Sequence, residues 1–94
     1  MSDSAAPYMK RPMEEYLADA SSNAPTPGGG SVSALAAALG TTMASMAGNF
    51  TVGKKKYAEV EAEVATLLGR LAEARDRLTG AVQADTEAYA QVSA

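Results

Sequence analysis

The sequence predicts an all-α fold, and three observations support that prediction. Alanine, leucine and valine dominate the apolar residues and only 5% of the residues are aromatic, a composition typical of closely packed helices. The stretch 31–50 carries no charge and has the pattern of a helix that is not markedly amphipathic. From residue 57 onward, apolar and small residues recur at alternating steps of three and four, the spacing of one helical face. We expect an antiparallel helical bundle with a buried central helix.

The length of the chain limits what it can bury alone. A domain of 94 residues hides only a modest part of its surface. We therefore expect the bundle to be completed by a C-terminal half that is missing here or by a dimer partner. The whole chain, 1–94, is interpreted as one partial helical domain. Residues 1–11 are expected to be disordered, because the first nine are mostly small or polar and include a proline.

The composition removes several classes of chemistry. The sequence has no Cys and no His, so thiolate and histidine catalysis, disulfides and the usual zinc ligands are excluded. We expect neither a metal nor a cofactor, and carboxylates as the acid-base groups. The net charge of −3 gives no reason to expect nucleic acid as a partner. No secretory signal is visible, so a cytoplasmic location is expected.

A short first helix is predicted to begin at Pro12, a residue that suits the first helical turn. Two glutamates follow it and complement the positive end of the helix dipole. The apolar face of this helix consists of Met13, Tyr16, Leu17 and Ala20. We expect the helix to end by residues 21–23, Ser-Ser-Asn, and to cover one side of the core.

The segment 24–34, Ala-Pro-Thr-Pro-Gly-Gly-Gly-Ser-Val-Ser-Ala, is the most specific in the chain. Its prolines restrict the backbone, and its three glycines allow a ligand to approach closely. Gly30 or Ser31 is expected to be the N-cap of the next helix, whose free N–H groups then suit a negatively charged or hydrogen-bond-accepting ligand. The segment is either such a site or a rigid turn with a capped helix start. It is not a P-loop, because no lysine follows at the required place.

The central helix is predicted over 31–50, inside a run of 34 residues, 20–53, that carries no charge. Because this helix is not markedly amphipathic, we expect it to be buried on all sides. A membrane span is the competing interpretation, which the polar residues of the helix disfavour. Gly40, Ala44 and Gly48 recur every fourth residue and predict a face that a neighbouring helix approaches closely.

A long third helix is predicted from Tyr57 to Val92, after a turn in which Gly53 adopts a left-handed conformation. The connection is short, so the helix should run back antiparallel. At about 1.5 Å per residue it is about 54 Å long, against about 30 Å for the central helix, and its last part should overhang. The apolar residues that something else must then cover are Val82, Ala88, Tyr89 and Val92. Gly80 marks a candidate kink.

Asp85 is the one carboxylate on the apolar stripe of the third helix. Desolvation in a packed interface favours its protonated form unless a cation or hydrogen-bond donors meet it, and functional acids and bases often lie in such places. Alternatively, the helix rotates or breaks near Gly80, and Asp85 faces water or caps a new helix. Periodicity alone leaves both interpretations open.

Lys54, Lys55 and Lys56 form a second unusual feature, because cations at the start of a helix oppose its dipole. One interpretation is a solvated turn, and the other is a contact for an anionic ligand. The remaining charges of the third helix, Arg75 among them, are interpreted as a solvated face without a chemical role.

Three blocks of the sequence resemble the cyclodeaminase and methenyltetrahydrofolate cyclohydrolase family. They are 25–31, Pro-Thr-Pro-Gly-Gly-Gly-Ser, before an alanine-rich helix, and 49–57, Asn-Phe-Thr-Val-Gly-Lys-Lys-Lys-Tyr. The third, 85–89, is similar to the acidic block of the family, with Tyr89 where phenylalanine is more usual. The resemblance covers most of the chain from about Met13. Members of the family are about twice as long, so the chain resembles their N-terminal half.

The resemblance implies a helical, usually dimeric enzyme of one-carbon tetrahydrofolate metabolism. The implied reaction is either ring closure of formiminotetrahydrofolate with loss of ammonia or hydrolysis of methenyltetrahydrofolate to the 10-formyl form. Asp85 is implied as the catalytic residue. The implied substrate-binding residues are Thr26, Pro27, Gly28, Gly29, Gly30, Ser31, Lys54, Lys55 and Lys56.

The expected partners follow from the same resemblance. They are a folate substrate and a second copy of the chain in a homodimer or homo-oligomer. The charge and the polar residues of the central helix, discussed above, indicate neither nucleic acid nor a membrane as a partner. The overhang of the third helix is an independent reason to expect a partner, because its apolar residues would otherwise be uncovered. The alternative function is a truncated, non-catalytic helical dimerisation module.

Overall fold

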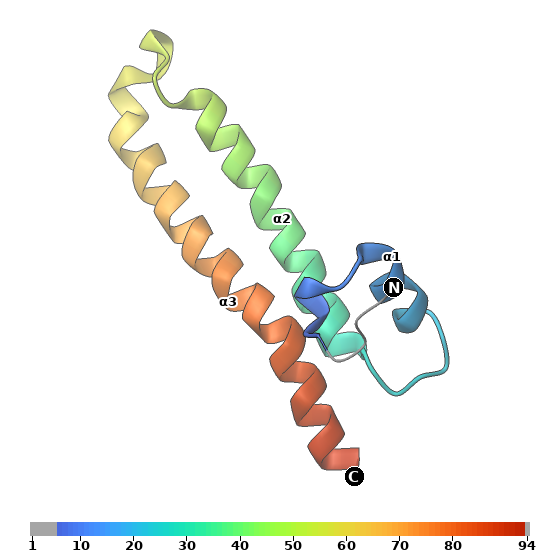
Figure 1. Cartoon of the computed structure of the whole chain (residues 1–94). Helices are drawn as coiled ribbons and strands as arrows, with labels where there is room; N and C mark the ends of the chain where they lie inside the picture. The colour runs from blue at the N-terminus through green and yellow to red at the C-terminus, as the bar shows by residue number, and fades with distance from the viewer. Residues whose placement is uncertain (1–5, 94) are drawn as a thin grey trace.

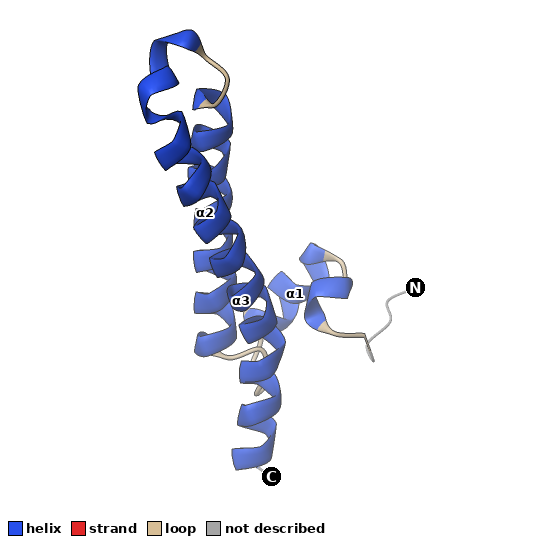
Figure 2. Cartoon of the chain, turned by 90° about the vertical axis from the view of Figure 1, so that its left-hand side faces the viewer, coloured by secondary structure: helices blue, strands red, loops and turns tan. Residues whose placement is uncertain are grey.

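The computed structural model describes residues 6–93, and the side chains of residues 6–91. Over this range the chain is all-α and contains no strand, so the predicted fold class is confirmed. In chain order the elements are the 3-10 helix η1 (Tyr8–Lys10), α1 (Met13–Ala20), α2 (Gly29–Thr51), the 3-10 helix η2 (Lys55–Val60) and α3 (Glu61–Ser93). Figures 1 and 2 show α2 and α3 side by side as the predicted antiparallel hairpin, with η1 and α1 beside the first turns of α2.

The start of α2 differs from the prediction, because Gly28 is its N-cap in place of Gly30 or Ser31. Gly28 has an extended backbone, with φ −94° and ψ −172°. Its carbonyl accepts a hydrogen bond from the N–H of Val32 at 3.0 Å. The N–H groups of Gly29 and Gly30 therefore belong to the first turn, where a helix provides no backbone acceptor for them.

The turn between α2 and α3 confirms the prediction for Gly53, whose φ is +85°. Its N–H donates to Oε1 of Glu61 at 2.6 Å. The α-helix that follows begins at Glu61 and not at Tyr57, because η2 intervenes and Tyr57 has a non-helical backbone, with φ −114° and ψ 18°. The electrostatics agree with this start: acidic residues occupy the first turn of α3, and the three lysines lie before it.

α3 runs without interruption through Gly80, so the predicted kink is absent and Asp85 stays on the inner face. Because Asp85 lies level with the start of α2, the last residues of α3 extend beyond its partner (Figure 1). Ala88 and Tyr89 on this overhang are exposed, as predicted, and the side chain of Val92 lies outside the described residues. Val82 is different: it is 0% exposed, and the chain covers it without a partner.

The core lies at the end of the hairpin that carries the glycines, where Tyr8, Tyr16 and Ala34 pack around Val82. The rings of Tyr8 and Tyr16 meet edge to face, with centroids 5.2 Å apart. Tyr8 belongs to the segment 1–11 that we expected to be disordered. Residues 1–5 lie outside the described part. Among residues 6–11 only Tyr8 is buried, because its large ring packs into the core.

α2 is not buried on all sides, which corrects the prediction for the central helix. Its buried residues are Ser31, Ala34 and Ala38, while Met43 and Phe50 are 62% and 65% exposed. By length and composition α2 is also able to cross a membrane, and 17% of its most apolar stretch is buried within the chain. The same properties fit the core helix of a bundle. The chain by itself leaves most of α2 uncovered.

The face of small residues on α2 is confirmed at one end only. A Cβ placed on Gly48 would lie 2.7 Å from Cδ2 of Leu68, so α3 does approach closely there. A Cβ on Gly40 would meet nothing within 4 Å. Of the two glycines in this predicted face, only Gly48 therefore lies where α3 approaches closely.

Candidate functional site

The glycine segment and Asp85 lie together in the structure. Gly28, Gly29 and Gly30 form one wall of a pocket of about 320 Å³ at the start of α2. Asp85, Ala88 and Tyr89 of α3 form the other wall. Two stretches that the sequence marked separately, and that are far apart along the chain, thus line one pocket.

Gly30 is the glycine that this arrangement requires. A Cβ on Gly30 would lie closer than 3.0 Å to the carboxyl carbon and both carboxyl oxygens of Asp85. Gly29 would meet nothing within 4 Å, and Gly28 would meet only the carbonyl of Pro25, at 3.9 Å. Gly30 does not have a positive φ, so the requirement is for space and not for an unusual backbone. The sequence did not distinguish the three glycines.

The carboxylate of Asp85 determines which charge on a ligand suits the pocket. Asp85 is partly buried, and among the described residues no hydrogen-bond or ion-pair partner meets its carboxylate. It lies against the first turn of α2, where free N–H groups and the helix dipole favour negative charge. A carboxylate of the protein therefore takes the place that an anionic ligand would occupy. The pocket suits a cationic or proton-donating group, which revises our expectation of a negatively charged ligand.

Ser31 lies inside the protein and does not line the pocket. It is 0% exposed, and its Oγ donates to the carbonyl of Val82 at 2.8 Å. Its second contact is with the hydroxyl of Tyr16, also at 2.8 Å. Since a carbonyl only accepts, the Ser31 proton is directed to Val82, and Tyr16 donates to Ser31. The Ser31 hydroxyl thus connects α2 to Tyr16 of α1 and to Val82 of α3. Ser31 follows Gly30, and Val82 lies about one turn before Asp85, so these hydrogen bonds fix the positions of the two pocket walls.

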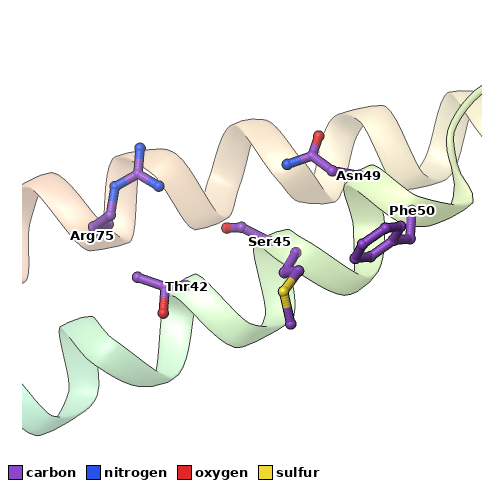
Figure 3. A pocket seen from close by; sticks show the side chains of 6 residues that line it. Thr42, Ser45, Asn49, Phe50 and Arg75 are labelled. Carbon is purple, nitrogen blue, oxygen red and sulfur yellow. The ribbon is translucent and has the colours of Figure 1, made fainter.

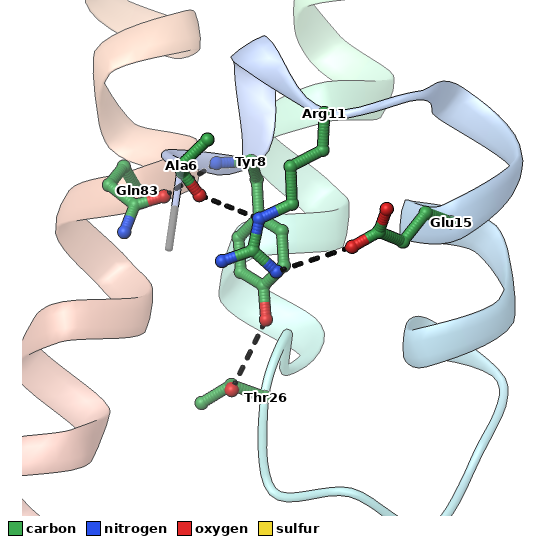
Figure 4. Close-up of polar contacts among 6 residues, drawn as sticks. All are labelled: Ala6, Tyr8, Arg11, Glu15, Thr26 and Gln83. Atoms are coloured by element: carbon green, nitrogen blue, oxygen red, sulfur yellow. Dashed lines mark hydrogen bonds and ion pairs between the residues drawn. The ribbon is translucent and has the colours of Figure 1, made fainter. Parts of the chain in front are cut away.

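Tyr8 holds the proline-glycine segment from the other side (Figure 4). Its backbone N–H donates to Oε1 of Gln83 on α3 at 2.9 Å. Its hydroxyl donates to Oγ1 of Thr26 at 3.3 Å, and the next residue, Pro27, is buried. Thr26 and Pro27, which we predicted to bind substrate, therefore help to anchor the segment and do not line the pocket. Tyr8 was missed because a single tyrosine in a polar segment has no periodicity.

The guanidinium of Arg11 lies over the ring of Tyr8. Its guanidinium carbon lies 4.4 Å from the centre of the ring, within the range of a cation–π interaction. Its Nε donates to the carbonyl of Ala6 at 2.6 Å, and its Nη1 lies 3.9 Å from Oε1 of Glu15. Figure 4 shows the contacts of Arg11 with Ala6 and Glu15 as dashed lines, and its guanidinium beside the ring of Tyr8. The positions of the loop and of α3 are thus tied to a segment that precedes α1.

Lys54, Lys55 and Lys56 lie at the opposite end of the hairpin. All three are exposed, and Nζ of Lys56 lies 5.6 Å from the centre of the Tyr57 ring. The length of α2, about 35 Å for 23 residues, separates them from the Asp85 pocket. The chain by itself does not place the lysines at that pocket. Within residues 6–93, no group of three carboxylates is arranged to hold a metal ion.

The fold and the pocket define a class: a small all-α protein that presents a carboxylate against the glycine-rich start of a helix. Comparison with known proteins then gives the family. Residues 12–94 match the family described as Formiminotransferase-cyclodeaminase, and the chain belongs to it. The resemblance inferred from the three sequence blocks is thereby confirmed.

Several curated relatives are similar over much of this chain. It is 44% identical over 77 residues to the methenyltetrahydrofolate cyclohydrolase of Methylorubrum extorquens, a match that covers 82% of this chain and 37% of that protein. It is 32% identical over 81 residues to the formimidoyltransferase-cyclodeaminase of Sus scrofa, which covers 86% of this chain and 15% of the pig protein. The chain thus spans well under half the length of each of these relatives.

Proposed function

We propose that this chain acts in one-carbon tetrahydrofolate metabolism and that its pocket at Gly30 and Asp85 binds the one-carbon group. The observation that carries the proposal is the contact between the Asp85 carboxyl group and Gly30 inside that pocket. Family membership supports the substrate class, because the relatives are named for reactions of folate derivatives.

The charge of the pocket fits the chemistry of both candidate reactions. Methenyltetrahydrofolate carries a positive charge on its one-carbon unit, and a protonated formimino group is also a cation. A carboxylate fixed at the start of α2 stabilises such a cation and is placed to accept a proton. In the hydrolysis, the oxygen of water bonds to the one-carbon unit while Asp85 takes one proton from that water. Asp85 passes this proton to N5 as the bond between N5 and the one-carbon unit breaks, and the remaining hydroxyl proton is released to solvent, which leaves the formyl group on N10.

Of the two reactions, the hydrolysis of methenyltetrahydrofolate is our first proposal. Identity to the bacterial cyclohydrolase is 44%, against 32% to the pig formimidoyltransferase-cyclodeaminase. Ring closure of formiminotetrahydrofolate is the second candidate. In that reaction a folate nitrogen attacks the formimino carbon, and the leaving nitrogen must be protonated before it departs as ammonia. The same carboxyl group is placed to mediate that proton transfer.

The test is the variant Asp85→Asn, which keeps the shape of the side chain but removes its charge and its proton exchange. We expect kcat to fall at least ~100-fold, the lower range for the loss of a positioned acid or base. The KM should stay within a few-fold. Loss of methenyltetrahydrofolate absorbance measures turnover, and formiminotetrahydrofolate is assayed in parallel. Glu87→Gln is the matched control, because it removes the same charge from an exposed position two residues further on.

Two outcomes would contradict the proposal in different ways. Near-normal turnover of Asp85→Asn, with a working parent chain, would show that the catalytic group lies elsewhere. Folate binding without turnover in the parent chain would favour the alternative, a non-catalytic dimerisation module.

We further propose that the chain forms a homodimer through the uncovered side of α2. Its large exposed apolar side chains are Val32, Leu39, Met43, Met46 and Phe50. Exposed apolar surface of this extent marks an interaction site. Sedimentation at micromolar concentrations should show a dimer or larger species, and a monomer throughout would contradict this proposal. The lysines of the turn contact the pocket's ligand only if a second copy brings its turn to the pocket.

A further inference from the structure

The segment 6–11 precedes the part of the chain that matches the family, which begins at residue 12. Among these six residues only Tyr8 is buried, at 7% exposed, and its ring belongs to the core together with Tyr16 and Val82. The family match therefore assigns this segment no role, although it reaches the part of the molecule that holds the Asp85 pocket.

Tyr8 is bonded to both segments that carry the walls of this pocket (Figure 4). Its hydroxyl donates to Oγ1 of Thr26 at 3.3 Å, two residues before Gly28, where the glycine wall begins. Its backbone N–H donates to Oε1 of Gln83 at 2.9 Å, two residues before Asp85 on α3. One residue thus links the loop to α3 without lining the pocket itself.

Local contacts hold Tyr8 in place within its own segment. In η1 the N–H of Lys10 donates to the carbonyl of Pro7 at 2.8 Å, and the N–H of Arg11 donates to the carbonyl of Tyr8 at 3.1 Å. The guanidinium of Arg11 covers the ring, and its Nε donates to the carbonyl of Ala6. These bonds close the segment into a compact turn, so the ring and the backbone N–H of Tyr8 keep a fixed relation to each other.

The rest of the hairpin does little to fix α3 against α2. Between residues 39 and 81 no residue is buried. On one side the two helices leave an open hollow of about 410 Å³, lined among others by Thr42 and Asn49 of α2 and by Arg75 of α3 (Figure 3). The position of Asp85 relative to α2 therefore depends on the contacts at the glycine end.

Two separate links at the glycine end together fix that position. The first is the hydrogen bond from Oγ of Ser31 to the carbonyl of Val82, which joins α2 and α3 at one point and leaves α3 free to turn about it. The link through Tyr8 is the second, and two points determine the direction in which Asp85 faces. The tolerance is small, because a Cβ on Gly30 would lie closer than 3.0 Å to the carboxyl atoms.

We propose that Tyr8 is a positioning residue for the reaction at Asp85. By holding Thr26 and Gln83, it sets the separation and the relative rotation of the two pocket walls, and with them the place of the carboxylate against the first turn of α2. Tyr8 acts through these residues and contacts neither the substrate nor the reacting atoms. The kinetic part of this inference rests on the proposed function, whereas the effect on the geometry of the pocket does not.

The kinetic test removes one hydrogen bond from either side. Tyr8→Phe keeps the buried ring, and we expect kcat for methenyltetrahydrofolate to fall about 5-fold, the change in population that one net hydrogen bond supports. The KM should stay within two-fold, because the groups that line the pocket remain. Thr26→Val should give the same loss, and Thr26→Ser, which keeps the acceptor oxygen, should restore kcat. Combining Tyr8→Phe with Thr26→Val should lower kcat no further than either change alone.

The geometry of the pocket is measured without substrate, in the NMR spectrum of the ¹⁵N-labelled chain. The amide signals of Gly30 and Asp85 should shift in Tyr8→Phe and in Thr26→Val. Tyr57→Phe is the matched control, because it removes the same hydroxyl from an exposed residue at the opposite end of the hairpin, and it should change neither these signals nor kcat. Circular dichroism at the assay temperature checks that every variant is folded.

The outcomes that would overturn the proposal are distinct. They are an unchanged kcat in Tyr8→Phe, additive losses in the double variant, a change in KM alone, or equal signal shifts in Tyr8→Phe and Tyr57→Phe. If the parent chain turns over no folate, the proposed function fails by itself. The signals of Gly30 and Asp85 then decide whether Tyr8 positions the pocket: a shift in Tyr8→Phe supports that role, and unchanged signals overturn it.

Discussion

The two ends of the α2–α3 hairpin are built in different ways. Every buried residue in the described part of the chain lies at the glycine end: Tyr8, Tyr16, Pro27, Ser31, Ala34, Ala38 and Val82. Between residues 39 and 81 no residue is buried. The glycine end also has the hydrogen bonds that cross between elements, through Tyr8, Tyr16 and Ser31. Among the described residues, the side-chain hydrogen bond that joins the turn to α3 is the local one from the N–H of Gly53 to Glu61.

This difference shows which parts of the molecule depend on contacts outside the chain. The pocket at Gly30 and Asp85 is held by packing and hydrogen bonds that the chain makes with itself. The middle of the hairpin and its turn expose apolar and basic side chains, so their arrangement is more open to partners and ligands. Local stability should differ accordingly, because regions with few buried contacts open more readily.

The largest predicted effect belongs to the glycine end and concerns turnover. Gly30→Ala places a Cβ against the Asp85 carboxyl group and displaces it, so we expect kcat/KM to fall about 100-fold. Gly40→Ala is the matched control, because its Cβ meets nothing within 4 Å, it does not line the pocket, and alanine favours the helix by up to about 1 kcal/mol. Folate assays on both variants measure the effect. Similar activities in the two would show that the position of Asp85 does not matter.

The second prediction compares two serines of α2. Ser31→Ala removes the hydroxyl that joins three helices and leaves the buried Tyr16 hydroxyl without its partner, at a cost of about 2 kcal/mol. Ser45→Ala, in the open half of the hairpin, should change the free energy of unfolding by less than about 0.5 kcal/mol. Chemical unfolding followed by circular dichroism compares the two. A larger loss for Ser45→Ala would reverse our assignment of the stable end.

A smaller effect is expected for the N-terminal contact. Tyr8→Phe keeps the buried ring but removes the hydrogen bond to Thr26, so the free energy of unfolding should fall by about 1 kcal/mol. Tyr57→Phe, at the exposed turn, should have no measurable effect. Hydrogen exchange at residues 26–30 gives a second measurement, since the loop should open more often when its anchor is lost. Unchanged exchange would mean that the backbone bond to Gln83 is sufficient to hold the segment.

The smallest change is expected at the turn. Replacing Lys54, Lys55 and Lys56 together by glutamine should leave the free energy of unfolding unchanged or raise it by less than about 0.5 kcal/mol, because the three charges oppose the dipole of α3. Thermal unfolding measures this effect. If the same variant also loses folate affinity, a second copy must bring its lysines to the pocket, and the separation between the two ends would hold only within one chain.

The sequence predicted the fold class, the hairpin and the conformation of Gly53, because helical periodicity and a glycine after a helix are local signals. It also marked Asp85, but two interpretations remained until α3 was seen to continue through Gly80. Burial was predicted less well. Ser31 has the sequence signature of an N-cap, and its position in the core depends on Tyr16 and Val82, which come from distant parts of the chain.

Arg75 is a second residue whose environment the sequence did not predict. Its place among many charges on α3 indicated a solvated face, and the spacing alone gave no reason to separate it from its neighbours. Among the described residues Arg75 forms no ion pair, which becomes visible only when the uncharged α2 lies beside it. The environment of a side chain that packs against another element cannot be predicted from the local sequence pattern.

The contact between Gly30 and Asp85 also restricts how the sequence can change over time. The smallest residue faces the shortest acid, so neither position can take a larger side chain without a compensating change in the other. A chain with glycine or alanine at position 85 would have room for a side chain at position 30, whereas one with glutamate there would have even less space. The two substitutions are therefore coupled, and their effects should not add. We therefore expect positions 30 and 85 to vary as a pair, although most of the α2–α3 hairpin separates them in the sequence.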